Sequence, residues 1–123
     1  MNRGSRRDWL LAAFGSAVAG WAGAQVSAYP SKPITLVVGF APGGAVDIIA
    51  RAIGQQIAPA LGQPVVVENK PGAGGSIGAD FVAKSPADGY TLVMATSSTH
   101  SIGPYLAKLP YDPEKDFTPV VWV

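Results

Sequence analysis

The sequence contains no cysteine and only one histidine among its 123 residues. Disulfide bonds, thiolate zinc sites and a cysteine nucleophile are therefore excluded, as is a lipid anchor of the bacterial lipoprotein type. Charged residues are also scarce, at 14%, whereas hydrophobic residues reach 48%. Because a chain with this composition can bury a core, we expect a folded domain and not a disordered one.

Long hydrophobic runs are missing as well. The longest apolar stretch, residues 9–24, is interrupted by Gly and Ser and falls short of the ~20 residues that a membrane-spanning helix needs. It follows an arginine-rich start and ends in the small-residue cleavage motif Ala22-Gly23-Ala24. We therefore predict a signal peptide over residues 1–24, with a weaker cleavage motif ending at residue 28. Export follows from this prediction, and the route stays open between Sec and twin-arginine, the latter because Arg6 and Arg7 are adjacent.

No excess of positive charge remains once this segment is removed. From residue 25 on there are six Lys and Arg against seven Asp and Glu, a net charge of −1. Nucleic-acid binding requires cations clustered on one face, so we expect no such partner. The acidic residues of 112–116 alternate with Pro and Lys, which is typical of a solvated turn and not of a metal site. We predict no cofactor and no metal.

The rest of the chain alternates β-branched runs with amphipathic segments. Strands are predicted at 34–40, 65–68, 90–95 and 120–123, and helices at 47–61, 76–85 and a short stretch ending at 107. Ser76 is the predicted N-cap of the second helix, and Pro59 predicts a kink or an early end of the first. The first two strands are expected to be buried. This alternation predicts an α/β fold whose parallel sheet is covered on both faces.

Three strand-to-helix loops contain the residues that a ligand site needs: Ala41–Gly44, Lys70–Ser76 and Thr96–Thr99. In a parallel sheet these loops leave from one edge, where open α/β sheets bind ligands. Each loop precedes a helix N-terminus, whose unpaired N–H groups and partial positive charge favour an anion. Glycines allow a close backbone approach, and Lys70 is the only cation in the three loops. We therefore predict that amides and dipoles hold a small anionic solute such as a carboxylate.

Phosphate and catalysis fit these residues less well. Residues 39–44 lack the Gly-Lys-Ser/Thr end of a P-loop, and Ile77 stands where a dinucleotide fingerprint requires its third glycine. Nucleotide binding stays a minor option. No motif places a base beside Ser97 or Ser98, and His100 stands alone, so we predict no enzyme. Asp47, in the first helical turn, either contacts a ligand or a bound water, or stabilises the helix dipole.

Six motifs follow one another along the chain: Tyr29–Ile34, Phe40–Asp47, Leu61–Asn69, Lys70–Gly75, Asp88–Leu92 and Leu109–Asp112. Together they resemble the Bug family of periplasmic solute-binding receptors, the extracytoplasmic component of tripartite tricarboxylate transporters. The resemblance covers Tyr29 to Val123. It implies a two-domain Venus-flytrap fold of the periplasmic binding protein type II-like class, with residues 25–123 forming the truncated N-terminal portion of domain 1 and the second domain absent.

The resemblance also implies a small di- or tricarboxylic or related organic acid as ligand, and the membrane components of the transporter as partners. We expect a monomer. The implied ligand-binding residues are Ala41, Pro42, Gly43, Gly44, Asp47, Gly74, Gly75, Ser76, Thr96, Ser97 and Ser98. Family members often carry a small hydroxyl residue where this chain has Ala45 and Val46, so only backbone contacts are expected from that pair. Two alternatives stay open: a secreted α/β hydrolase-type enzyme, and a ligand-sensing subunit for a periplasmic signalling partner.

Overall fold

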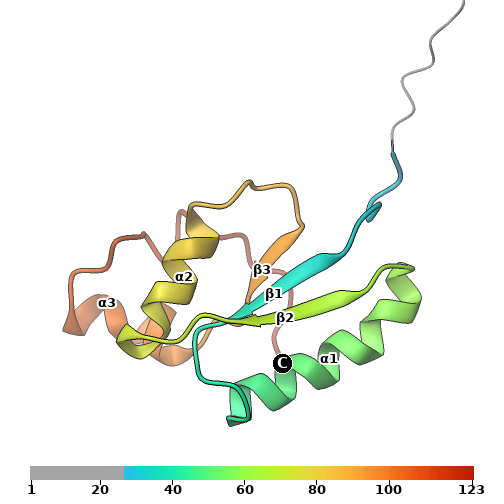
Figure 1. Ribbon diagram of the computed structural model, residues 1–123. Helices are drawn as coiled ribbons and strands as arrows, with labels where there is room; N and C mark the ends of the chain where they lie inside the picture. The colour runs from blue at the N-terminus through green and yellow to red at the C-terminus, as the bar shows by residue number, and fades with distance from the viewer. Residues whose placement is uncertain (1–26) are drawn as a thin grey trace, which may run out of the picture.

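The computed structural model describes residues 27–123, and its centre is a three-stranded parallel sheet with a helix on each face (Figure 1). Strand β1 (Ile34–Val38) lies between β2 (Val65–Asn69) and β3 (Thr91–Val93) and pairs in parallel with both. The predicted parallel α/β fold is confirmed. The predicted signal peptide lies outside the described residues.

Helix α1 (Ala45–Leu61) covers one face, against β1 and β2. Its buried Ala50 packs on Leu36 and Val38, which form the core of this layer. The helix begins two residues earlier than predicted. Pro59 does not end it early, because only the last turn is affected before the left-handed Gly62 terminates the helix.

Helix α2 (Ser76–Ala83) covers the opposite face, against β1 and β3. Small buried residues on its inner side let it approach the end of β1 closely, since a Cβ on Gly78 would lie 3.0 Å from Gly39 Cα. The predicted N-cap was wrong by one residue. Gly75 occupies that position with φ 94°, which favours glycine, and Ser76 is the first helical residue.

The remaining strand predictions need correction. Strand β2 is not buried throughout: it is an edge strand, and Val66 is 52% exposed because α2 covers β1 and β3 instead. Strand β3 is shorter than predicted. The strand predicted at 120–123 was wrong: these residues form no strand, are exposed and pair with neither β2 nor β3, the two edge strands of the described sheet.

The predicted third helix is shorter than expected, and most of the loop predicted before it, Thr96–Thr99, is itself helical. A π-helical turn, Ser97–Ser101, is followed by α3 (Gly103–Leu106). Among residues 27–123, no helix is long and apolar enough to cross a membrane.

Candidate functional site

The three predicted loops meet at the carboxyl edge of the sheet. A Cβ built on Gly39, at the end of β1, would lie 2.7 Å from Gly75 Cα in the second loop. A Cβ on Gly75 would lie 2.8 Å from Thr99 Cγ2, in the third loop, and 3.2 Å from the Phe40 ring. The second and third loops therefore contact each other and the end of β1, from which the first loop leaves, so the prediction that the three loops leave from one edge is confirmed.

The strand order also defines where this edge is open to a ligand. In the order β2-β1-β3, helix α1 connects β1 to its neighbour β2 on one face of the sheet. Helix α2 then connects β2 to β3 on the other face, past β1. Sheets of this order bind ligands at the point between β1 and β3 where the direction of the connections changes. The first and third loops are the ones that follow these two strands.

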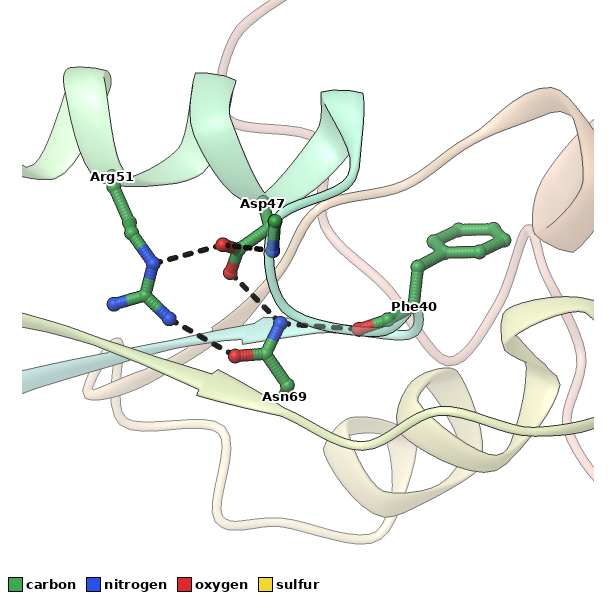
Figure 2. Close-up of polar contacts among 5 residues, drawn as sticks. Phe40, Asp47, Arg51 and Asn69 are labelled. Atoms are coloured by element: carbon green, nitrogen blue, oxygen red, sulfur yellow. Dashed lines mark hydrogen bonds and ion pairs between the residues drawn. The ribbon is translucent and has the colours of Figure 1, made fainter.

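The first loop is held by a buried carboxylate, which Figure 2 shows together with its donors. Asp47 is 3% exposed. Its Oδ2 accepts hydrogen bonds from the Gly43 N–H at 2.9 Å and from Arg51 Nε at 2.9 Å, and its Oδ1 accepts one from Asn69 Nδ2 at 2.8 Å. Of the two roles considered for Asp47, this geometry favours the structural one, because its bonds run to the protein's own groups.

The electrostatics of this carboxylate agree with that role. The hydrogen bond from Arg51, followed by those from Gly43 and Asn69, holds the pKa of Asp47 far below its ordinary value. The same hydrogen bond raises the pKa of Arg51. Both side chains are therefore ionised over the physiological pH range, and the Asp47 carboxylate neutralises the charge of Arg51.

Hydrogen-bond donors in the first loop are distributed unevenly. The Gly43 N–H is committed to Asp47, and the Gly44 N–H points to Ala41 O at 3.4 Å. The first residue of α1 that bonds back into the turn is Ile48, whose N–H donates to Gly44 O at 3.0 Å. The N–H groups of Ala45, Val46 and Asp47 precede it, so they have no carbonyl of an earlier turn to bond. These three amides lie at the N-terminus of the 17-residue helix, whose partial positive charge favours an anion.

The second loop is a succession of left-handed residues. Ala73, Gly74 and Gly75 have φ values of 48°, 66° and 94°. The Ser76 hydroxyl, which was a candidate ligand contact, donates back to Ala73 O at 2.6 Å. This loop therefore presents mainly backbone to the site.

The third loop binds the second through hydroxyl groups. Ser98 Oγ donates to Gly74 O at 3.0 Å, and Thr96 Oγ1 lies 2.9 Å from Ser98 Oγ. Because the Ser98 hydroxyl has one hydrogen, which goes to Gly74, the hydrogen of the second bond comes from Thr96. Ser97 is exposed, and its hydroxyl has no hydrogen bond within residues 27–123. Of the three candidate hydroxyls in this loop, Ser97 is the one left for a ligand.

His100 supports the third loop by contacting Thr99 and the Phe117 ring. Its Nδ1 lies 2.8 Å from Thr99 Oγ1, and its ring packs edge-on against Phe117 with centroids 4.7 Å apart. Tyr111 adds a hydrogen bond from its hydroxyl to Thr99 O at 2.9 Å. Burial lowers the pKa of His100. Thr99 is only 2% exposed, so this hydroxyl–imidazole contact is not an accessible nucleophile with a base.

Metal chemistry has no visible site in this part of the chain. Within residues 27–123, no three His, Asp or Glu side chains are grouped as metal ligands would be. The acidic turn predicted at 112–116 is present: Asp112 Oδ1 accepts hydrogen bonds from the N–H groups of Glu114 and Lys115, which lowers the pKa of Asp112.

Comparisons with known proteins define the class of protein first. BugD, a periplasmic binding protein of known structure, is 44% identical, with a TM-score of 0.71 over 74% of this chain and 30% of that one. MatC from Rhodopseudomonas palustris, solved with bound malate, is 45% identical, with a TM-score of 0.71 over 75% of this chain and 32% of that one. The fold is that of a periplasmic solute-binding protein.

The family follows from the sequence. The model of the tripartite tricarboxylate transporter family receptor matches residues 49–123. Protein BugT of Bordetella pertussis is 48% identical over 120 residues, which cover 93% of this chain and 36% of BugT. The chain belongs to this receptor family, which is a family of solute-binding proteins and not of enzymes, and it spans about a third of the length of the curated relatives it matches.

Three residues of the site were not singled out in the sequence: Arg51, Asn69 and Phe40, whose carbonyl accepts from Asn69. The only signal for Asn69 is an amide side chain two residues after the run Val65–Val67, at the edge where the loops leave. Its partners are 18 to 29 positions away, so no local pattern identifies them.

Proposed function

We propose that the full protein is a periplasmic receptor that captures a small di- or tricarboxylic or related organic acid for a tripartite tricarboxylate-type transporter. The observation that carries this proposal is that the second and third loops contact each other and the end of β1 at the carboxyl edge of the sheet, from which the first loop leads into the uncapped N-terminus of α1. Membership of the receptor family and the malate bound to MatC support it.

In this proposal the ligand contacts are mainly backbone groups. One carboxylate of the ligand accepts from the N–H groups of Ala45 and Val46 and from the Ser97 hydroxyl, near the positive end of α1. The surfaces around it come from 41–44, 74–76 and 96–98. Asp47, Thr96 and Ser98 contribute by holding these loops in place, since their polar groups bond to the protein itself.

A carboxylate fits better than a phosphate because the site holds little free positive charge. Arg51 is paired with Asp47 at 2.9 Å, and Lys70 is paired with Glu68 at 2.8 Å. A phosphate carries up to two charges and three acceptor oxygens, and proteins usually meet it with unpaired cations or several consecutive amides. The amides of Ala45 and Val46, together with the Ser97 hydroxyl, are sufficient donors for one carboxylate.

The experiment is a thermal-shift screen of the full-length protein. The panel contains malate, citrate, glutamate, nicotinate and benzoate, with malamide as the neutral counterpart of malate and inorganic phosphate as the competing anion. A ligand at about 100 times its Kd adds roughly 2.7 kcal/mol of stability, which is a shift of several degrees. A melting temperature that no carboxylate raises contradicts the proposal, and a response to phosphate alone assigns a different ligand class.

Two further tests separate this proposal from its alternatives. A lack of acid released from amides and esters, such as malamide, on prolonged incubation argues against a secreted hydrolase. Loss of uptake of the same acid when the genes for the membrane components are deleted supports transport, whereas unchanged uptake supports a sensing role.

A further inference from the structure

We propose that Asn69 is a positioning residue: its side chain fixes the first loop so that the amides of α1 point at the ligand. This inference rests on the proposed function, because it assigns a residue to the same carboxylate site. Asn69 does not contact the ligand in this proposal. It acts through Asp47 and the carbonyl of Phe40.

The amide of Asn69 connects three separate parts of the first loop and helix, as Figure 2 shows. Its Nδ2 donates to Phe40 O at 3.1 Å, before the turn, and to Asp47 Oδ1 at 2.8 Å, after it. Its Oδ1 accepts from Arg51 Nη2 at 3.0 Å, one helical turn further along. The donor and acceptor sides of one side chain thus span the whole connection from strand to helix.

Asn69 is itself held firmly. It is the last residue of β2 and pairs in register with Val38, the last residue of β1, which is fully buried. The Lys70 N–H donates to Val38 O at 2.8 Å and continues this pairing by one bond. A side chain anchored on the sheet therefore determines the position of a loop whose glycines would otherwise allow many conformations.

The consequence for binding comes from two effects. The loop is ordered before the ligand arrives, so less conformational entropy is lost on binding. Asp47 is an anion beside a proposed anion site, and Asn69 and Arg51 keep its carboxylate turned inward by direct hydrogen bonds. Without Asn69, the Asp47 carboxylate loses a donor and the Gly43 turn loses part of its support.

The charges around Asn69 allow a pH-dependent test. Among residues 27–123, the charged groups that bond to it or to its partners are Asp47 and Arg51, both on α1. Its chain neighbours Glu68 and Lys70 pair with each other. In Asn69→Asp, a second carboxylate faces Asp47, and like charges this close raise the pKa of one of them. Protonation of that carboxyl restores an O–H donor to its partner.

The experiment measures malate affinity in the full-length protein by calorimetry, for wild type, Asn69→Asp and Asn69→Leu, at about pH 8 and about pH 5.5. We expect Asn69→Asp to lose roughly tenfold in affinity at the higher pH relative to wild type at the same pH, and to recover most of it at the lower pH. Asn69→Leu, of similar size but without polar groups, should lose a similar factor at both. Lys84→Gln is the matched control, because it removes the i,i+4 ion pair to Asp80 at the far end of α2 and should leave affinity unchanged.

A ligand-free readout distinguishes positioning from general stability. Hydrogen exchange of the Gly43 amide should accelerate in both Asn69 variants, while exchange in the core strand β1 stays as in wild type. If wild type binds malate and both variants bind it equally well, the positioning role is wrong and the proposed function stands. If β1 exchanges faster as well in both variants, the residue acts through global stability and the inference is overturned. If wild type binds no member of the carboxylate panel, the proposed function fails and the inference fails with it.

Discussion

The sharpest prediction concerns the amide of Ala45, the first residue of α1. In Ala45→Pro this N–H is deleted, while the helix should remain intact, because proline is well tolerated at the first helical position. The preceding Gly44 already has φ −77° and ψ 169°, an extended conformation that a following proline requires. The substitution therefore removes one proposed donor to the ligand with little change to the fold.

The magnitude follows from the kind of bond that is lost. A hydrogen bond to a charged group contributes about 1.5–3 kcal/mol, so the affinity for a carboxylate should fall roughly ten- to a hundredfold. The melting temperature of the ligand-free protein should change little, since Ala45 N–H has no partner in an earlier helical turn. Ala45→Gly keeps the N–H and serves as the matched control, with an affinity near that of wild type.

The assay is calorimetric titration of the full-length protein with the acid that gives the largest thermal shift. Loss of affinity in Ala45→Pro, with an unchanged melting temperature and normal binding in Ala45→Gly, supports backbone recognition at this helix terminus. Wild-type affinity in Ala45→Pro refutes the reasoning, because a donor on which the site depends would then have been removed without effect.

Three further predictions concern the loops. The full-length Asp47→Asn variant should be less stable than wild type at neutral pH, and its stability should depend less on pH in the acid range. The reason is that a carboxylate whose folded-state pKa is held far below 3.8 contributes stability that is present above pH 3.8 and lost as the pH falls below it. An unchanged pH dependence in urea titrations contradicts this. Gly75→Ala should destabilise the protein by roughly 2–4 kcal/mol, because of its φ of 94° and the contact of the new Cβ with Thr99. Gly43→Ala, with a φ of 85° but open space around the Cβ, should cost about 1 kcal/mol. Equal urea midpoints for the two variants would refute the packing argument. Ser97→Ala should weaken ligand binding by roughly tenfold at an unchanged melting temperature. Ser98→Ala should lower the stability by about 1 kcal/mol, because its hydrogen bond to Gly74 is lost. If melting and titration experiments show the reverse, Ser98 contacts the ligand and Ser97 supports the loop, contrary to the proposal.

The sequence was sufficient for the fold because local patterns determine it. The β-branched runs that became β1, β2 and β3 are short and bounded by turn residues, and the segment that became α1 repeats its apolar residues at helical spacing. The meeting of the three loops followed from the geometry of parallel sheets alone. Strand lengths and burial were less predictable, since the exposure of Val66 depends on which strand α2 covers.

The roles of individual polar groups could not be predicted from local pattern. Ser76, Ser97 and Ser98 are equivalent in sequence, as hydroxyls in loops before helices. Only the folded chain shows that Ser76 and Ser98 donate to backbone carbonyls, one within its own turn and one across to Gly74. The same holds for Asp47, whose partner Asn69 is 22 positions away.

In the proposed receptor, a site with so little charge holds an anion because these groups have different roles. Gly43 and Gly44 in the first loop, and Gly74 and Gly75 in the second, allow a close approach to a ligand, but glycines also lose more conformational entropy when they are ordered. In this structure the charged and hydroxyl side chains supply the order: Asp47 and Asn69 hold the first loop, and Ser98 holds the second. The donors that remain are fixed dipoles, which need no reorganisation when an anion arrives and carry no charge that must be desolvated. A ligand that needs only one carboxylate to satisfy such donors is free to vary beyond it, so in the proposed receptor the loops described here select for the carboxylate and leave the choice among acids to contacts with the rest of the ligand.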